Sequence, residues 1–175
     1  MSRAGPGTVL LPSDRIRARV VEMAAEIRRD IPGSVHLVAV LKGAVVFLAD
    51  LIRCLDGDVT VDFMSVSSYA NRTSSGEVRL LKDLDISLAG KDVILVEDII
   101  DTGVTLAYLH EILRARGPRS LRTACLLSKP ARRLIDVPVE YIGFAIDDQF
   151  VVGYGLDHAE HFRHLPYIRA IESKP

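Results

Sequence analysis

Apolar and polar positions alternate along the chain with two different spacings, one typical of helices and one typical of strands. From Ile16 to Ile27 apolar residues recur every three or four positions, which predicts a helix. Ser13 can cap this helix at its start, and Pro32 followed by Gly33 ends it. The next apolar residues, 37–41, are continuous over a length that suits a strand.

The rest of the chain continues this alternation. An apolar helix is expected at 44–55, and a later helix carries Leu106, Leu109 and Leu113 on one face before Gly117 ends it. Further strands are expected at 59–66, 93–96, 121–127 and 139–144. The polar stretch 67–77 between two of these elements has neither spacing and is long for a plain connection, which is typical of a lid.

Strands that alternate with helices of crossover length predict an α/β fold with a mostly parallel, twisted sheet flanked by helices. The less regular stretch from 146 onward is expected to form a small C-terminal hood over the sheet edge. We find no linker, repeat or low-complexity tract, so we expect one domain over residues 9–175. Residues 1–8 have no apolar core of a signal peptide and are expected to be a short disordered lead-in.

Composition and charge narrow the class of protein further. The 175 residues are 49% hydrophobic and carry 22 basic against 23 acidic side chains, which excludes a disordered or coiled-coil chain. The net charge of −1 gives no general attraction to nucleic acid or to an anionic membrane. Lys42 and Asp50 interrupt the longest apolar stretch, so it cannot span a bilayer. Cys54 and Cys125 lie far apart, which favours a reducing, cytoplasmic setting.

The most informative segment is a buried strand that leads into a polar turn and a helix, VILVEDIIDTGVTL at 93–106. In an open α/β sheet, ligands bind beyond the carboxyl ends of the strands. The turn from Asp101 to Thr105 offers backbone N–H groups at a helix N-terminus, together with the hydroxyls of Thr102 and Thr105. This combination predicts a site for a phosphate monoester.

Two adjacent carboxylates, Glu97 and Asp98, precede the turn and would repel a phosphate. They therefore need a different ligand, either sugar hydroxyls or a divalent cation such as Mg²⁺. The competing interpretation is a strand that ends in solvated acids, with Asp101 capping the helix. The ordered set of features after one buried strand favours the ligand site.

The segment at 93–106 resembles the phosphoribosyl-pyrophosphate motif of the type I phosphoribosyltransferases, and most closely the branch that acts on hypoxanthine and guanine. The resemblance extends from about Leu10 to Ile168, nearly the whole chain. Other matching segments are Leu41-Lys42-Gly43, Asp62-Phe63, Ser68-Tyr69, Leu81 to Leu84, Leu126 to Lys129, Phe150 to Asp157 and Phe162 to Tyr167.

The resemblance implies transfer of a phosphoribosyl group to a purine base, with expulsion of pyrophosphate and with Mg²⁺ as cofactor. It implies that Glu97 and Asp98 hold the ribose hydroxyls and Mg²⁺, and that Asp157 binds a second Mg²⁺. It also implies a cis peptide bond between Leu41 and Lys42. The 5′-phosphate would bind to Asp101, Thr102, Gly103, Val104 and Thr105. Pyrophosphate would bind to Leu41, Lys42, Gly43 and Arg163, with Lys42 and Gly43 contributing backbone groups.

For the purine, the resemblance implies that Lys129 donates to the 6-oxo group and that Phe150 stacks on the base. Val151 and Asp157 would line the same pocket. We expect Asp101 to be the catalytic base, because a carboxylate beside a phosphate is useful only if it faces the purine. The lid contact would be formed by Ser68 and Tyr69. Two departures from the family pattern are Val104, where some relatives have a polar residue, and His158, where a tyrosine is usual.

Alternatives remain open at this point. Each residue taken singly also fits a bland role: Lys129 as a loop lysine, Phe150 as core, and Asp157 and Arg163 as surface charges. The base could be xanthine instead of hypoxanthine or guanine, and the fold could serve an RNA-binding regulator, although the near-neutral charge argues against one. His158, His161 and His164 favour a histidine-rich turn over a metal cluster. The expected partners are phosphoribosyl pyrophosphate, a purine base and further copies of the chain, in a homodimer or homotetramer.

Overall fold

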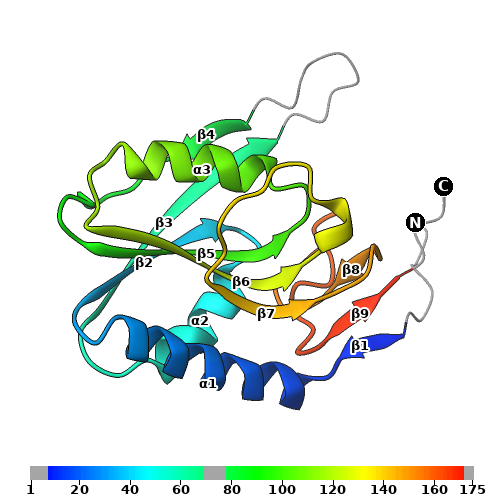
Figure 1. The fold of residues 1–175 in the computed structure, drawn as a ribbon. Coiled ribbons are helices and arrows are strands. Elements are labelled where there is room, and N and C mark those ends of the chain that lie inside the picture. The colour runs from blue at the N-terminus through cyan, green and yellow to red at the C-terminus, as the bar shows by residue number, and fades with distance from the viewer. Residues whose placement is uncertain (1–7, 69–77, 172–175) are drawn as a thin grey trace.

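A computed structural model describes residues 8–68 and 78–171 of the chain. Its main layer is a six-stranded sheet with the strand order β4-β3-β2-β5-β6-β7 (Figure 1). Neighbouring strands are parallel except β4, which runs antiparallel to β3. The predicted mostly parallel α/β sheet is therefore confirmed. The strands are β2 (Val35–Leu41), β3 (Val59–Ser68), β4 (Val78–Lys82), β5 (Asp92–Ile100), β6 (Ser120–Ser128) and β7 (Tyr141–Ala145).

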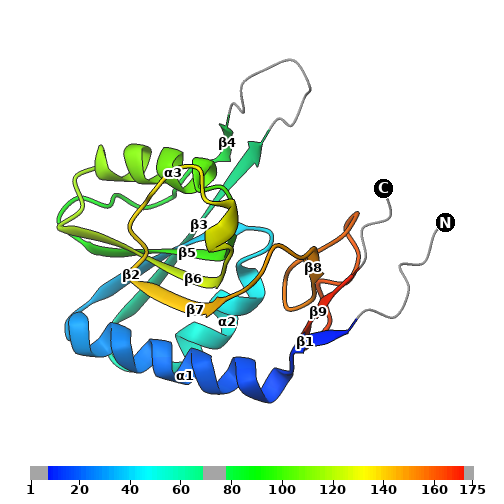
Figure 2. The ribbon, with the colours of Figure 1, turned by 45° about the vertical axis from the view of Figure 1, so that its right-hand side comes forward.

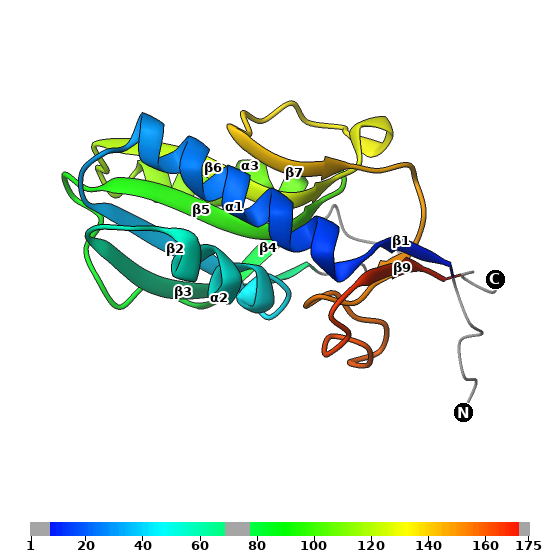
Figure 3. The same ribbon diagram turned by 90° about the horizontal axis from the view of Figure 1, so that it is seen from below.

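Helices cover both faces of this sheet. Helices α1 (Ser13–Asp30) and α2 (Val45–Cys54) lie side by side on one face, and α3 (Val104–Arg114) lies on the other (Figures 1 and 3). Along β2, Leu37 and Ala39 pack with the α1 and α2 core, whereas Val38 and Val40 pack with the α3 core. Because both faces are buried, the central strands are continuous apolar runs and do not alternate with polar residues.

A second, three-stranded sheet forms the hood, in the order β1-β9-β8. Its strands are β1 (Val9–Leu11), β8 (Val151–Val152) and β9 (Ile168–Ala170). They stand apart from the main sheet, beyond the N-terminal end of α1 (Figure 2). The N-terminal strand thus pairs with the C-terminal one, with Leu11 opposite Ile168. The expected C-terminal hood is present, but β1 was not among the predicted strands, because three residues carry no periodicity.

Two local expectations were wrong. Ser13 is the first residue of α1 and not its cap: Pro12 holds the cap position, with no side-chain hydrogen bond to the helix. The strand expected at 93–96 extends as β5 to Ile100, so Glu97 and Asp98 lie within the strand and not after it. Parallel pairing with β6 continues to Ile100 and supplies the hydrogen bonds for these polar residues.

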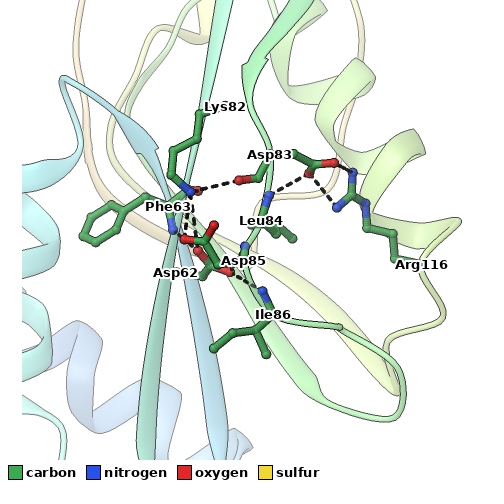
Figure 4. Close-up of polar contacts among 8 residues, drawn as sticks. All are labelled: Asp62, Phe63, Lys82, Asp83, Leu84, Asp85, Ile86 and Arg116. Carbon is green, nitrogen blue, oxygen red and sulfur yellow. Dashed lines mark hydrogen bonds and ion pairs between the residues drawn. The ribbon is translucent and has the colours of Figure 1, made fainter.

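A buried carboxylate stabilises the loop that connects β4 to β5. Asp62 on β3 is 4% exposed and accepts the backbone N–H groups of Phe63, Asp85 and Ile86 (Figure 4). Lys82 adds its Nζ, which donates to the Phe63 carbonyl at 3.0 Å. These bonds tie β3, the end of β4 and the following loop together, at the base of the segment that contains the expected lid.

The strand order indicates where along the sheet a ligand is expected to bind. The chain proceeds from β2 outward to β3 and β4, then returns to the other side of β2 with β5. The point between β2 and β5 is therefore the topological switch point, where open α/β sheets bind ligands. Within the part of the chain that the structure describes, no helix is both long and apolar enough to cross a membrane.

Candidate active site

The carboxyl ends of the central strands carry the residues that the sequence singled out. Lys42 and Gly43 follow β2, the turn at 101–103 follows β5, and Lys129 follows β6. Registers of β2, β5 and β6 place these ends at one edge, where the backbone N–H of Lys129 donates to the Ile100 carbonyl at 2.9 Å. The hood residues Phe150 to Arg163 belong to the segment that follows β7.

Gly43 lies directly against the carboxylate of Asp98. A Cβ at this position would lie 1.6 Å from Asp98 Oδ2, so no side chain fits there. Gly155 of the hood packs on the other side, where its own Cβ would lie 2.1 Å from the Gly43 carbonyl oxygen. The peptide bond between Leu41 and Lys42 is cis, as the resemblance implied. The β2 turn, the β5 acids and the hood therefore meet at one point.

Glu97 and Asp98 are adjacent acids on β5, of which Glu97 is buried and Asp98 is half-buried. Burial raises the pKa of Glu97 well above its usual range, and the charge of Asp98 raises it further. Burial also raises the pKa of Asp98 to about 6, partly opposed by its hydrogen bond from the Ile99 N–H and by the charge of Arg163. Within 8–68 and 78–171, neither carboxylate has an ion-pair partner. The arrangement suits a ligand that supplies positive charge or hydroxyl donors.

We predict that Asp98→Asn stabilises the fold, although it removes a carboxylate that is expected to bind the ligand. The raised pKa means that ionised Asp98 is less stable in the folded chain than in the unfolded chain. Folding stability should therefore fall as pH rises from about 4, the ordinary value for aspartate, through about 6, and stay low above it. The neutral amide avoids this loss, and each 1 kcal/mol gained raises the Tm by about 2–4 °C.

The measurement is the Tm in metal-free buffer at pH 4 and at pH 8, for the wild type, Asp98→Asn and the exposed control Glu111→Gln on α3. The advantage of Asp98→Asn should be present at pH 8 and shrink toward pH 4. A lower Tm for Asp98→Asn at pH 8 would show that its charge is stabilised in the fold, contrary to the prediction.

The turn after β5 presents a helix N-terminus to the same edge. Gly103 precedes α3 with φ of 86°, and its Cβ would lie 2.5 Å from the Ile135 carbonyl oxygen, so glycine is required on both counts. The first turn of α3 has no acidic residue and no side-chain cap, which leaves its positive end unneutralised. The Thr102 carbonyl is occupied by the N–H groups of Leu134 and Ile135. This geometry can receive an anion.

A chain of ion pairs crosses the expected purine side of the site. Asp101 Oδ1 accepts from Arg132 Nε at 2.8 Å, and Arg132 Nη1 lies 3.4 Å from Asp148 Oδ2. Asp148 also lies 3.5 Å from Lys129 Nζ, whose side chain is only 10% exposed. Asp101 and Lys129 are therefore linked through two residues that the sequence analysis missed, Arg132 and Asp148.

The aromatic residue expected to stack on the base is accessible. Phe150 is 42% exposed, and the ring of His158 meets it edge-on with ring centroids 5.3 Å apart. This exposure fits an aromatic side chain that can contact a planar ligand, and the stacking itself stays a prediction. Val151, the next residue, is buried in β8 and pairs with Ala170, so its backbone and not its side chain is available to a ligand nearby.

The residues expected around pyrophosphate are paired with one another. Arg163 donates to the Gly155 carbonyl at 2.8 Å and forms an ion pair with Asp157 at 2.8 Å. Asp157 accepts the N–H of Glu160 with its other oxygen. Glu160 in turn contacts Lys42 at 2.9 Å and Arg163 at 3.5 Å. Glu160 is a further residue that the sequence analysis did not single out.

Some expectations are not settled by this geometry. The expected lid contact consists of Ser68 and Tyr69. Ser68 is the last residue of β3, and Tyr69 lies outside the described residues. Both oxygens of Asp157 already have protein partners, so its expected Mg²⁺ role stays a prediction. Val104 begins α3, and its N–H donates to Thr102 Oγ1 at 3.4 Å, so its expected contact with the 5′-phosphate stays a prediction. His158 and His161 pair through their backbones across a tight turn.

Comparison with known proteins gives consistent matches over nearly the whole chain. The family model of the phosphoribosyl transferase domain matches residues 9–159. The hypoxanthine-guanine phosphoribosyltransferase of Bacillus subtilis is 47% identical over 166 residues, which cover 94% of this chain and 92% of the relative. The hypoxanthine phosphoribosyltransferase of Escherichia coli K12 is 49% identical over 164 residues, which cover 91% and 92%.

Solved structures agree with the sequence matches. A crystal structure of a hypoxanthine-guanine phosphoribosyltransferase from Bacillus anthracis, with a HEPES molecule in its active site, superposes with a TM-score of 0.91 at 47% identity. The alignment covers 94% of this chain and 98% of that chain. Sequence and fold therefore lead to the same family.

Proposed function

Because the chain belongs to the phosphoribosyl transferase family, we propose that it transfers the 5-phosphoribosyl group of phosphoribosyl pyrophosphate to a 6-oxopurine. A ring nitrogen of hypoxanthine or guanine attacks the anomeric carbon, the bond from that carbon to pyrophosphate breaks, and the base loses a proton. The products are IMP or GMP and pyrophosphate, as in purine salvage. The reaction class agrees with the names of the relatives.

The observation that carries this proposal is the contact of Gly43 with Asp98. It brings the turn after β2 against the acids of β5, beside the N-terminus of α3. A phosphoribosyl pyrophosphate has three parts in this order: pyrophosphate for the turn at Lys42 and Gly43, ribose hydroxyls for Glu97 and Asp98, and a 5′-phosphate for the turn at 101–105. Such convergence on a single ligand supports these roles.

The base is proposed to lie on the other side of Asp101. Lys129 donates to the 6-oxo group, Phe150 stacks on the ring, and backbone carbonyls near Val151 and Asp157 accept from the 2-amino group of guanine. Asp101 accepts the proton from N7 as the new bond forms. Its ion pair with Arg132 holds the carboxylate at this edge while no base is present.

We propose Mg²⁺ as the cofactor. The donor set fits the ion only in part: Glu97 supplies a buried carboxylate and Asp98 a half-buried one, and in the described ranges no group of three or more His, Cys, Asp or Glu is arranged to hold a metal. Mg²⁺ commonly takes one or two carboxylates and completes its shell with water and substrate oxygens. Bound with the substrate, the ion would neutralise charge that develops on pyrophosphate.

Further parts of the proposal concern surroundings of the site. Cys54 and Cys125 are free thiols in the structure, which supports a reducing, cytoplasmic setting.

We propose that the protein forms a homodimer or homotetramer. We also propose that Ser68 and Tyr69 belong to a lid that excludes water during transfer. A single domain over 9–175 is part of the same proposal.

The function is tested by incubation of the protein with phosphoribosyl pyrophosphate, Mg²⁺ and one free base at a time, with chromatographic detection of the nucleoside monophosphate. Hypoxanthine and guanine should give product, and chelation of Mg²⁺ should stop it. Product only from xanthine would reassign the base, and product only from a pyrimidine base would refute the purine site.

A further inference from the structure

The hood contains a turn whose backbone is held in an unusual conformation. The N–H of His158 donates to the His161 carbonyl and the N–H of His161 donates to the His158 carbonyl, both at 3.1 Å. The two residues between them, Ala159 and Glu160, have φ angles of 51° and 64°. Such two-residue turns normally use Gly or Asn, because a Cβ is unfavourable in the left-handed region.

The strained turn aims one carboxylate at two cations. Glu160 Oε2 lies 2.9 Å from Lys42 Nζ, and Glu160 Oε1 lies 3.5 Å from Arg163 Nη2. The N–H of Glu160 is also held, by Asp157 Oδ2 at 2.9 Å. A solvent-exposed glutamate is charged at neutral pH, so its contact with Lys42 is an ion pair. Residues held in rare backbone conformations are often functional, and here the conformation places a negative charge.

Lys42 and Arg163 come from different parts of the fold, and both belong to the proposed pyrophosphate site. Lys42 follows β2, and Arg163 lies in the hood segment that packs on Gly43 through Gly155. A carboxylate that contacts both cations therefore lies where an oxygen of pyrophosphate would have to approach. Pyrophosphate is a polyanion, so it must displace this carboxylate or bind against its charge.

We propose that Glu160 is a residue that sets the affinity for pyrophosphate: it occupies Lys42 and Arg163 as an internal anion and competes with pyrophosphate for them. This inference rests on the proposed function. The side chains of Lys42 and Glu160 are 67% and 66% exposed, so their ion pair is readily broken and the competition is graded. Weaker retention of pyrophosphate aids release of the product and leaves the 5′-phosphate turn unaffected.

The test compares wild type with Glu160→Gln, which keeps the size of the side chain and removes its charge. Glu111→Gln on α3 is the matched control, since it removes one exposed glutamate charge away from the hood. Binding of inorganic pyrophosphate with Mg²⁺ and binding of IMP are each measured by titration calorimetry. Because two weak, exposed ion pairs are lost, we expect pyrophosphate to bind Glu160→Gln about 3–10-fold more tightly than wild type. IMP affinity should stay the same in all three proteins.

Unchanged or weaker pyrophosphate binding by Glu160→Gln, with IMP binding intact, would overturn the inference and leave the proposed function standing. An equal gain in Glu111→Gln would also overturn it, because the effect would then reflect net charge. If wild type bound neither pyrophosphate nor IMP, the proposed function itself would fail, and this inference with it.

Discussion

Asp101→Asn is expected to lower turnover by about 10²–10⁴-fold while phosphoribosyl pyrophosphate still binds, because removal of a positioned general base typically has this effect. Asparagine keeps the size and one oxygen of the side chain, but it cannot take a proton from N7. The turn itself depends on Gly103 and the helix N-terminus, so binding of the 5′-phosphate should survive. Steady-state rates and calorimetric binding of phosphoribosyl pyrophosphate measure the two effects separately.

The ion pair of Asp101 with Arg132 offers a second explanation for any loss, and a control separates the two. The side chains of Asp101 and Arg132 are 41% and 45% exposed. Exposed ion pairs contribute only about 0–1 kcal/mol to folding stability. Arg132→Gln removes the pair and keeps the carboxylate. If Asp101 is the base, Arg132→Gln should retain a rate within about 10-fold of wild type. Equal losses in the two variants would mean that Asp101 acts through Arg132.

The fold and the edge that carries the site could be predicted from local patterns. Continuous apolar runs, helices with one apolar face and Gly-Pro breaks are read from neighbouring residues, and parallel pairing follows from their alternation. The segment 93–106 was informative because strand, acids, turn and helix stand together in the chain. The hydrogen bonds that extend β5 to Ile100 come from β6 instead, and therefore the strand end was placed too early.

The partners of the site residues could not be predicted in the same way. Asp148 meets Lys129, and Glu160 meets Lys42, only because strand order and the hood fold bring distant segments together. In the sequence around such an exposed acid, nothing distinguishes one that pairs with a site residue from one that only contacts solvent. The tight contacts of Gly43 and Gly155 likewise depend on the packing of the hood against the β2 turn.

Three charged side chains of the site are paired with opposite charges of the same chain. Asp101 has Arg132, Lys129 has Asp148, and Lys42 has Glu160. Glu97 and Asp98 differ, since within 8–68 and 78–171 neither has an ion-pair partner and the pKa of each is raised. With the roles proposed above, we expect substrate binding to exchange the partners of the cations and to supply partners to the acids. The exchange lowers the net affinity for each anion, and specificity must come from groups that are left unpaired by a wrong ligand.

Lys129 is such a group, and we expect it to exclude adenine by at least about 10²-fold in kcat/KM relative to hypoxanthine. A 6-oxo group accepts a hydrogen bond from the ammonium, whereas a 6-amino group presents hydrogens to it. The Lys129 side chain is 10% exposed, and with a mismatched base its ammonium keeps only the 3.5 Å contact with Asp148, so a largely buried donor loses one of its hydrogen bonds. The preference is measured as kcat/KM for hypoxanthine, guanine and adenine under the same conditions, and guanine should be accepted.

Lys129→Met tests whether this one donor causes the preference. Methionine has similar length and no charge, so the variant should lose rate with hypoxanthine and lose most of its discrimination against adenine. Lys91→Met is the matched control, since Lys91 lies before β5 at the opposite edge of the sheet, and it should keep both rate and preference. Wild-type protein that used adenine as well as hypoxanthine would refute the role of Lys129 and the 6-oxopurine assignment. A preference that survived in Lys129→Met would instead place the discrimination on backbone groups of the hood beside Phe150.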